Sequence, residues 1–345
     1  MFDALLAGYY GFGNFGDELL ASRAVDCLVS CGVERNRIAI LSGNPAMSER
    51  ALGIKAFDRG AGSRGMFAAI SSSRCVIFAG GGIFQDASSL ASCLYYWAVI
   101  RIALAMRRPV CAVAQSVGPL GSRAARLFAR DALKRCSYFS VRDDASRALS
   151  ATLGLDPPMT PDLVMGFSIP RIGGRQGIGT VLFNVRPCSD KRIAARAVGA
   201  ARACSAGGCK IRGVAFADGD MAEIRNFISL GELPECETVL VKDLRDFIDA
   251  SEDASAAIGM RLHFGILSKL RGLGVFMSPY DPKVECFTNR FADICPDFNE
   301  ITVNDIIKLL TKSLFEDKRK IDADEAGRAS AEDFKAALRA CSGGC

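Results

Sequence analysis

The chain has 345 residues, which at about 150 residues per domain predicts two domains. It carries 43 Lys and Arg against 38 Asp and Glu, and this net charge of +5 is scattered rather than clustered, which argues against a nucleic-acid-binding surface. Hydrophobic residues make up 50% and charged residues 23%, so the composition is typical of a folded globular protein and excludes a disordered chain.

The 14 cysteines form no CxxC pair or zinc-like Cys/His block, and a single histidine excludes a histidine-rich metal site. The segment Met1 to Leu6 lacks the basic region and long apolar stretch of a signal peptide. We therefore expect a cytoplasmic protein, acting at the inner face of the membrane if its substrate is held there, with reduced cysteines that pack as small hydrophobic residues.

The longest apolar segment, Cys93 to Met106, contains Arg101 and is shorter than the ~20 residues that span a bilayer. No transmembrane helix is expected. Because Tyr95 to Trp97 precede basic residues on this helix, its composition also suits a membrane-surface helix, although a buried core helix is the favoured interpretation.

Short β-type runs alternate with helical patterns along the whole chain, which predicts an α/β fold of parallel sheets with helical crossovers. The expected strands are 4–8, 38–41, 75–79, 110–115, 138–141, 179–185, 211–216, 237–241, 256–260 and 273–278. The expected helices are 18–29, 91–107, 122–135, 144–153, 191–203, 221–230, 244–250, 264–270, 305–315 and 331–340.

Two segments rich in proline or glycine, Asp156 to Pro161 and Gly173 to Gly177, predict the region of a linker. We expect an N-terminal Rossmann-like domain over residues 1–168, a C-terminal Rossmann-like domain over 175–325, and a C-terminal helix over 326–345 that could pack on either domain. Ligands of such domains bind beyond the carboxyl ends of the strands, so functional motifs should follow strands.

The first βα turn, Gly11 to Glu18, has the GxGxxG pattern after an expected strand, as a dinucleotide-binding turn does. Asp17 and Glu18 put negative charge at the start of the helix where a pyrophosphate would lie, which argues against a nicotinamide cofactor. Ligand binding and a plain tight turn capped by Asp17 remain equal alternatives.

A second glycine-rich turn, Gly80 to Asp86, follows the expected strand 75–79. Its Gln85 and Asp86 are groups that bind sugar hydroxyls, although a plain strand-to-helix turn has the same pattern. A third turn, Gln115 to Pro119, also follows a strand, so we expect three turns of one sheet edge to converge.

Arg142 follows the expected strand 138–141, where a guanidinium can bind a carboxylate or a phosphate through two hydrogen bonds. The alternative is that it only makes an ion pair with a nearby acid such as Asp143 or Asp144. Its position and residue type favour a binding site.

The single histidine, His263, lies where an expected strand gives way to a helix, two residues after Arg261. Lys283 follows the next expected strand, so the three side chains can line one pocket. An isolated histidine is more often a packed core residue, but a buried cluster of cations without an anion would be unfavourable. The cluster therefore predicts an anionic ligand.

Taken in order, these motifs resemble those of the polysaccharide pyruvyl transferase family, the S-layer cell-wall type in particular. The matching segments are 11–18, 80–86, 115–120, 141–143 with Ser146, 162–163, 185–187, 260–263 and 280–284. The resemblance implies a GT-B-like arrangement of two domains. It also implies transfer of a pyruvyl group from phosphoenolpyruvate to hydroxyls of a cell-surface saccharide or its lipid-linked precursor, forming a ketal, with no metal and no nicotinamide.

Carried over residue by residue, the resemblance assigns the catalytic acid to His263. It assigns the phosphoenolpyruvate contacts to Arg142, Arg261, the main chain at Leu262, and Lys283. The candidates for binding the acceptor are Asn14, Asp17, Gln85, Asp86 and Arg186. The sequence departs from the expected pattern at Asn184, Cys188 and Pro279, and these departures bear on the acceptor rather than on the donor site.

Two other functions are compatible with this fold: a GT-B glycosyltransferase that uses a nucleotide sugar, and a non-catalytic saccharide-binding protein. A nucleotide sugar needs a pocket for its base and ribose, commonly with a ribose-binding acid, and nothing near His263 clearly provides one. A non-catalytic relative is expected to lose the cationic cluster, whereas this sequence retains all of its members: Arg142, Arg261, His263 and Lys283.

Overall fold

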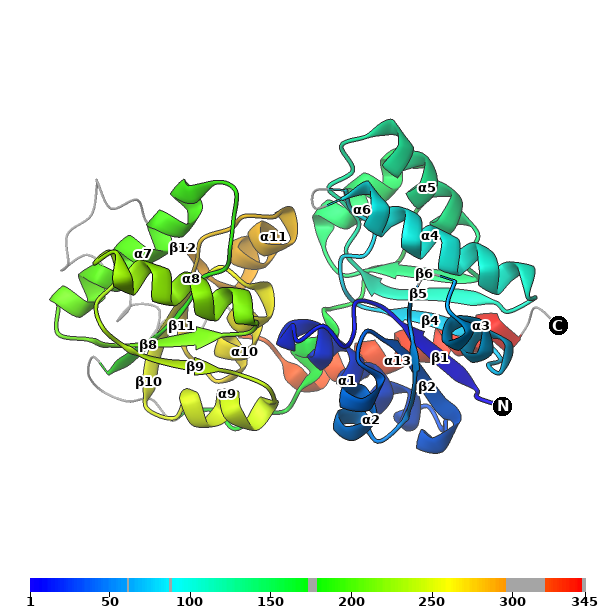
Figure 1. Ribbon diagram of the computed structural model, residues 1–345, viewed down its shortest axis with the longest axis horizontal. Coiled ribbons are helices and arrows are strands. Elements are labelled where there is room, and N and C mark those ends of the chain that lie inside the picture. The colour runs from blue at the N-terminus through cyan, green and yellow to red at the C-terminus, as the bar shows by residue number, and fades with distance from the viewer. Residues whose placement is uncertain (61, 87–88, 173–178, 296–319, 343–345) are drawn as a thin grey trace. The chain divides into compact units, whose positions relative to one another are not determined.

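The computed structural model describes residues 1–60, 62–86, 89–172, 179–295 and 320–342, and these residues form two α/β units (Figure 1). Unit 1 comprises Met1–Gly166 together with Asp324–Cys345, and unit 2 comprises Phe167–Ala323. Each unit is built on a parallel sheet of six strands with the Rossmann order, in which the first and fourth strands of the unit lie side by side.

Unit 1 has the strand order β3-β2-β1-β4-β5-β6. Its strands are β1 (Ala4–Ala7), β2 (Ile38–Ser42), β3 (Lys55–Asp58), β4 (Val76–Ala79), β5 (Val110–Gln115) and β6 (Tyr138–Val141). Its helices are α1 (Phe15–Ser30), α2 (Pro45–Leu52), α3 (Arg64–Ser71), α4 (Leu90–Ala105), α5 (Arg123–Lys134), α6 (Asp144–Thr152) and α13 (Ala323–Ser342), with short 3-10 turns at Arg35–Arg37 and Leu163–Gly166.

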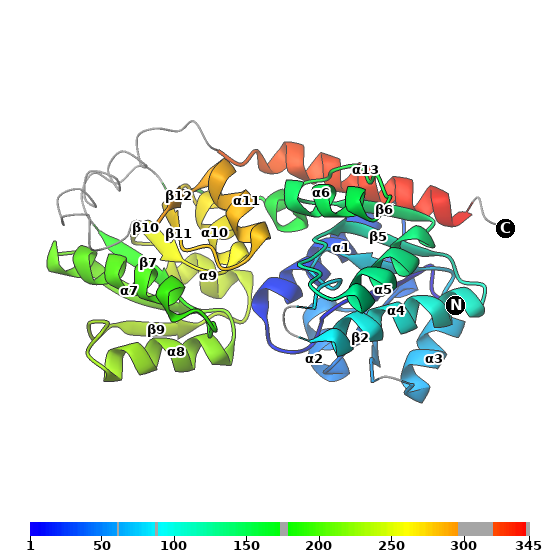
Figure 2. The ribbon, with the colours of Figure 1, turned by 90° about the horizontal axis from the view of Figure 1, so that it is seen from above.

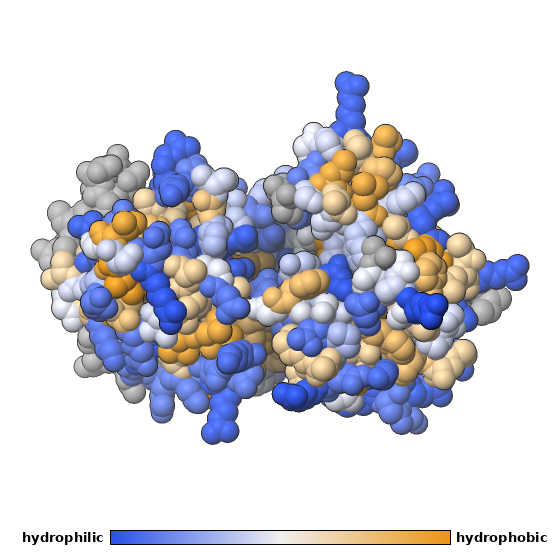
Figure 3. Space-filling view, viewed as in Figure 1, coloured by the Kyte–Doolittle hydropathy of each residue, from blue (hydrophilic) through white to orange (hydrophobic). Residues whose placement is uncertain are grey.

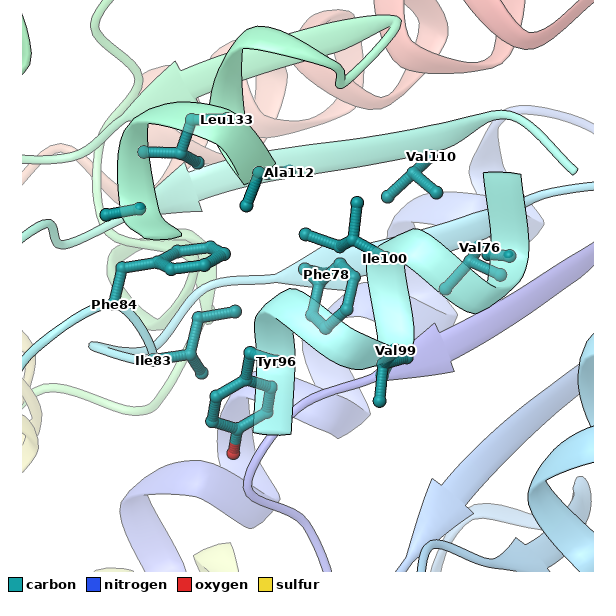
Figure 4. Close-up of a cluster of buried hydrophobic side chains, with 14 of the residues drawn as sticks. Val76, Phe78, Ile83, Phe84, Tyr96, Val99, Ile100, Val110, Ala112 and Leu133 are labelled. Atoms are coloured by element: carbon teal, nitrogen blue, oxygen red, sulfur yellow. The ribbon is translucent and has the colours of Figure 1, made fainter. Parts of the chain in front are cut away.

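The core of unit 1 lies between its sheet and the helices that cover it. On one face, Phe78 of β4 and Val110 of β5 pack against Tyr96 and Ile100 of α4, as Figure 4 shows. Every residue of β4 and β5 is buried, as expected of strands covered on both faces.

Unit 2 has the strand order β12-β11-β10-β7-β8-β9. Its strands are β7 (Thr180–Asn184), β8 (Lys210–Ala215), β9 (Glu237–Leu240), β10 (Ala254–Gly259), β11 (Gly274–Met277) and β12 (Asp293–Ile294). Its helices are α7 (Lys191–Ala206), α8 (Asp218–Ser229), α9 (Leu244–Ala250), α10 (Leu262–Leu270) and α11 (Pro282–Phe291).

The C-terminal helix α13 packs on unit 1. Its amphipathic pattern alone is compatible with packing on either domain. Figure 2 shows α13 running along unit 1 beside β6. The hydroxyl of Ser140 in β6 donates to Asp333 at 2.6 Å, and Tyr138 donates to the same carboxylate. The thiol of Cys111 in β5 lies 3.4 Å from the carbonyl of Ala337.

The proline-rich segment from Asp156 to Pro161, one of the two segments that mark the expected linker region, belongs to unit 1. The N–H of Val141 donates to the carbonyl of Pro158 and the N–H of Thr160 donates to the carbonyl of Val141, so the segment runs along the edge of β6. Prolines are tolerated there because an edge segment does not need every N–H for the sheet. The chain leaves unit 1 further on, after Gly166.

All ten strands expected from the sequence are present, with ends that differ by up to two residues. The short edge strands β3 and β12 are missed, as are the helices α2, α3 and α11. β3 has only four residues, of which Ala56 alone is buried, and this is too short a pattern to stand out. The helix expected at 305–315 lies outside the described residues.

Within the described part of the chain, no helix is long and apolar enough to cross a membrane. On the face seen in Figure 3, hydrophobic residues form separate patches among hydrophilic ones. Trp97 of α4 packs against Phe128 of α5, and its indole N–H donates to Asp131 at 2.8 Å. This helix therefore belongs to the packed core, as the favoured interpretation predicts.

Candidate functional site

The predicted donor residues of unit 2 follow neighbouring strands of its sheet. Arg261 and His263 follow β10, and Lys283 follows β11, whose last residue Met277 pairs with Gly259 at the end of β10. Asn184 at the end of β7 pairs with Gly259 from the other side. The carboxyl ends of these strands therefore bring Arg261, His263 and Lys283 to one sheet edge.

Arg261 is held by a carboxylate that the sequence analysis did not identify, that of Asp220 in the first turn of α8. Its Nε donates to Asp220 Oδ2 at 2.5 Å and its Nη2 donates to Oδ1 at 2.6 Å. The side chain of Asp220 is fully buried and that of Arg261 is 15% exposed. Two parallel hydrogen bonds fix the plane of the guanidinium, and its Nη1 edge points away from Asp220.

The backbone around Arg261 is fixed by Asn184. Its side-chain oxygen accepts a hydrogen bond from the N–H of Arg261 at 3.2 Å, and its amide donates to the carbonyl of Val214 at 2.8 Å. Arg261 is the N-cap residue of α10, and its side chain makes no capping hydrogen bond. The first N–H groups of α10 therefore have no side-chain cap from this position, an arrangement that favours an anion at the helix start.

His263 stands in the first turn of α10, half-buried between two buried neighbours, Leu262 and Phe264. Phe264 packs edge-to-face on Phe216 and Phe247, which anchors this turn in the core of unit 2. A Cβ at Gly259 would lie only 2.5 Å from the ring of Phe264. The glycine at the end of β10 therefore lets the helix start close to the sheet.

Lys283 also has a carboxylate partner. Asp281 is the N-cap residue of α11, accepting from the N–H of Lys283 at 3.0 Å, and its other oxygen accepts from the ammonium of Lys283 at 3.0 Å. Beside them, Arg186 from the segment after β7 donates to the hydroxyl of Tyr280 at 2.7 Å and stacks on its ring at 4.6 Å. Arg186 thus lies on the same edge of unit 2 as the donor candidates.

Arg142 lies at the carboxyl edge of the sheet of unit 1, in a buried polar network. Its Nη1 is 2.6 Å from Asp162 Oδ2, and these two side chains are 3% and 4% exposed. Its Nε donates to the hydroxyl of Ser116 at 2.7 Å, and Ser116 donates to Asp143 at 2.6 Å. Asp143 also accepts from the N–H and the hydroxyl of Ser146, which closes the network.

Each of the three cations predicted to contact the donor has a carboxylate partner within its own unit. Arg261 is paired with Asp220, Lys283 with Asp281, and Arg142 with Asp162. The partner of Arg142 is neither of the adjacent acids that the sequence suggests. Asp220 is 41 residues from Arg261 along the chain, and the order of the strands brings the two together.

The three glycine-rich turns of unit 1 converge, as expected. The hydroxyl of Tyr10 in the first turn donates to the carbonyl of Ala79 at 2.8 Å. The N–H of Ser116 in the third turn donates to the carbonyl of Gly81 in the second turn at 2.8 Å. The amide of Gln115 donates to three backbone carbonyls and joins β4 to β5.

The first turn is not capped by Asp17, which corrects one of its two interpretations. The N-cap residue of α1 is Asn14, whose amide donates to the Asp17 carboxylate. Glu18 reaches back instead, and its Oε1 accepts from the N–H of Gly11 at 2.8 Å. Burial raises the pKa of Glu18 to about 7, opposed by the backbone N–H groups of the loop.

In the second turn, Asp86 and Gln85 have different environments. Both oxygens of Asp86 accept backbone hydrogen bonds, from Gly121 at 2.7 Å and Ser122 at 2.8 Å, and these bonds lower its pKa. Asp86 thus joins this turn to the segment before α5. Gln85 is half-buried on the same turn. Both remain candidates for acceptor hydroxyls.

Sequence reasoning missed Asp220, which follows β8, and it connected Asn184, the last residue of β7, with the acceptor rather than with the backbone of Arg261. It also missed Arg59 after β3, which is buried among four aromatic rings. Asp220 could have been predicted as a site residue, because it is an acid that follows the expected strand 211–216. Arg59 could not, because the strand that it follows, β3, was not predicted.

Two Rossmann units with these loops at the carboxyl edges of their sheets define an α/β protein of the GT-B class. Among solved structures, the chain is similar to Anabaena Alr3699/HepE in complex with UDP and glucose, with 12% identity, TM-score 0.59, and 97% and 96% of the two chains covered. It is also similar to UDP-GlcNAc 2-epimerase from Methanocaldococcus jannaschii, with 10% identity, TM-score 0.62, and 97% and 99% covered. At these identities the likeness shows the fold alone, and the expected fold class is confirmed.

Residues 14–269 match the family model of polysaccharide pyruvyl transferases, and the chain belongs to this family. The family expected from the motifs is therefore confirmed. No curated protein matches the sequence.

Replacing Glu18 with Gln is expected to change how stability depends on pH. The folded pKa of Glu18 is raised from 4.5 to about 7, so its contribution to stability is present below pH 4.5 and is lost as pH rises through 7. Glu18→Gln keeps an oxygen for Gly11, so its unfolding free energy should gain about 3 kcal/mol over wild type between pH 4 and pH 8. Urea titrations at several pH values measure this difference.

The exposed Glu34→Gln variant serves as the control, because it also removes one carboxylate from unit 1. Its stability should follow that of wild type across the pH range. If the unfolding free energies of wild type and Glu18→Gln changed with pH in the same way, the result would contradict the burial of an ionised Glu18.

Removing Asp220 is expected to destabilise unit 2. Asp220→Ala takes away the carboxylate that compensates a guanidinium only 15% exposed, and losing one partner of such a pair costs about 3 kcal/mol. Urea unfolding followed by circular dichroism measures the loss. The control is Asp249→Ala, whose partner Arg245 is 3.8 Å away with both side chains largely exposed, and it should cause no measurable change. Equal stabilities of the two variants would show that the Asp220 pair contributes little.

Proposed function

We propose that the protein transfers the pyruvyl group of phosphoenolpyruvate to two hydroxyls of a saccharide and so forms a cyclic pyruvate ketal. Membership of the polysaccharide pyruvyl transferase family supports a saccharide as the acceptor. The observation that carries the proposal is the edge of unit 2, where Arg261, oriented by a buried carboxylate, stands beside the only histidine and an uncapped helix start.

The chemistry needs one acid and no redox step. Protonation of the methylene carbon of phosphoenolpyruvate makes its C2 electrophilic, and the first sugar hydroxyl adds there. Phosphate then leaves, and the second hydroxyl adds to the same carbon. Of the two hydroxyl protons, one is balanced by the proton gained in the new methyl group and the other leaves with the phosphate, so the reaction needs no oxidant or reductant.

His263 acts as the general acid in this proposal, because it is an acid–base group on the same turn as the anion-binding groups. The Nη1 edge of Arg261 and the N–H of Leu262 bind the carboxylate or phosphate of the donor. Lys283 adds a third contact when its ammonium turns from Asp281 towards the phosphate. The family pattern also assigns Arg142, in unit 1, to the recognition of the donor.

The acceptor is proposed to be a cell-surface saccharide or its lipid-linked precursor, of the S-layer cell-wall type. Asn14, Asp17, Gln85 and Asp86 are the candidates of unit 1 for its hydroxyls, and Arg186 is the candidate of unit 2. Asn14 and Asp17 are already joined by a hydrogen bond, so they would present a preformed pair of polar groups to the sugar.

A second candidate function is a nucleotide-sugar enzyme, which the fold likeness to UDP-bound HepE favours. A saccharide-binding protein without activity is the third. Phosphoenolpyruvate distinguishes them, because only a pyruvyl transferase needs to recognise it.

Phosphoenolpyruvate is expected to raise the melting temperature of the wild-type protein, whereas UDP-GlcNAc is not. Arg261→Ala should abolish most of this shift, because removing one partner of a desolvated charged contact costs on the order of 2–4 kcal/mol of binding. Differential scanning fluorimetry measures both effects. A shift with UDP-GlcNAc but none with phosphoenolpyruvate would favour the nucleotide-sugar function.

Replacing His263 with Ala is expected to lower turnover by at least about 100-fold while leaving the affinity for phosphoenolpyruvate within a few-fold of wild type. The physical reason is that the cations and the helix start still bind the anion when the proton donor is gone. Phosphate release with phosphoenolpyruvate and a saccharide acceptor measures turnover, and calorimetry measures affinity. Normal turnover in the variant would remove His263 from the mechanism without affecting the family assignment.

A further inference from the structure

Arg59 is a buried cation at the carboxyl edge of the sheet of unit 1. It follows β3 directly, and its N–H donates to the carbonyl of Ser42 at the end of β2. Only 9% of Arg59 is exposed. It therefore lies at the edge where an open α/β unit binds ligands, two strands from the turn that carries Asn14 and Asp17.

Four aromatic rings surround the guanidinium of Arg59. Its Cζ lies 4.5 Å from the ring centre of Tyr95, 4.9 Å from Phe12, 5.5 Å from Tyr96 and 5.6 Å from Tyr9. Tyr95 and Tyr96 come from α4. Tyr9 and Phe12 come from the segment after β1 and stack on each other with centroids 4.4 Å apart. Rings at these distances attract the cation but do not neutralise it.

The polar contacts of Arg59 leave part of its guanidinium without a partner. Nε lies 3.3 Å from the hydroxyl of Tyr95 and Nη2 lies 3.2 Å from that of Tyr96. Nη1 is closed to solvent and has no hydrogen-bond partner among the described residues. No carboxylate of the described residues forms an ion pair with Arg59. The buried Arg142 and Arg261, in contrast, each form an ion pair with an aspartate.

A buried guanidinium without an anion is unfavourable unless a ligand supplies the charge. The surrounding groups indicate what kind of ligand this is. Tyr9 and Phe12 are 45% and 50% exposed, which is unusual for stacked aromatic side chains and leaves apolar surface for the face of a sugar ring. Burial raises the pKa of the Tyr96 hydroxyl, and the charge of Asp17 adds a smaller effect in the same direction, which places Asp17 near this cluster.

We propose that Arg59, Tyr9 and Phe12 form a subsite for an acidic saccharide, meaning a sugar ring that carries a carboxylate or a phosphate. The aromatic pair packs against the ring and Nη1 of Arg59 binds the anionic substituent. This inference rests on the proposed function, since it names the class of acceptor that the pyruvyl transferase would use.

The turn that carries Phe12 holds its ring at the surface of unit 1. Phe12 stands between Gly11 and Gly13, which have φ of 79° and 71°. Its ring fits against Gly43, where a Cβ would lie 2.7 Å from it. Because half of Phe12 is already exposed, a small shift of its ring to fit a ligand costs little burial.

The test is a binding titration without phosphoenolpyruvate, followed by ligand-observed NMR, with glucose, glucuronate and glucose 1-phosphate as probes. Wild type should bind at least one acidic sugar about tenfold more tightly than glucose, because a charged hydrogen bond is gained. A preference for glucuronate indicates a carboxylate, and a preference for glucose 1-phosphate indicates a phosphate.

Arg59→Gln should lose the preference for the acidic sugar. The control is Lys55→Gln, which removes one positive charge from β3 at an exposed position and should keep the preference. Phe12→Ala should weaken all three sugars together, because stacking does not depend on the charge of the ligand.

Equal affinities of the three sugars for wild type would overturn the proposal, as would an unchanged preference in folded Arg59→Gln. If Arg59→Gln does not fold, the Tyr9→Ala, Phe12→Ala double variant provides the test, because both side chains are half-exposed. Unchanged sugar affinities in this double variant would also overturn the proposal. Failure of the pyruvyl transfer is distinguishable, because it appears as the absence of phosphoenolpyruvate consumption with every acceptor while the binding titration is unaffected.

Discussion

A bidentate ion pair between Arg261 and Asp220 ties the start of α10 to the start of α8, and the geometry of the candidate donor site depends on it. Asp220 is fully buried and also accepts from the N–H of Phe216, so it cannot move without breaking backbone contacts. The guanidinium therefore has one orientation. Together with the bond from Asn184 to the Arg261 N–H, it sets where α10 begins, and with it the position of His263.

Unit 1 uses the same device. Arg142 is fixed by Asp162 and Ser116, and Asp143 extends the network to the start of α6. In both units a charged residue that follows a strand is held by an acid from another segment of the same unit. Compared with well-packed apolar residues of the same volume, such buried pairs add little net stability. They do fix the orientation of a cation before any ligand binds.

The fold could be predicted from the sequence because its central strands are short, continuous apolar runs between helical patterns, such as Val110–Gln115. The positions of Arg142, Arg261, His263 and Lys283 after strands could be predicted for the same reason. Their partners could not, because Asp220 and Arg261 come together only through the strand order of unit 2. Arg59 was missed since β3 shows just one fully buried residue, Ala56, in four.

The pairing changes the physical basis on which an anion would be recognised. Because Arg142, Arg261 and Lys283 already have carboxylate partners, the attraction of a donor cannot come from excess positive charge. In the proposed function it would come from directed groups, namely the second edge of Arg261, the N–H groups at the start of α10 and the ammonium of Lys283. Arg59 is the opposite case, a buried cation among aromatic rings without a carboxylate partner in the described residues. Charge-paired, directed groups in unit 2 and a buried cation without a carboxylate partner in unit 1 would select for different ligands, and the proposed transferase needs this difference because it has to distinguish its donor from its acceptor.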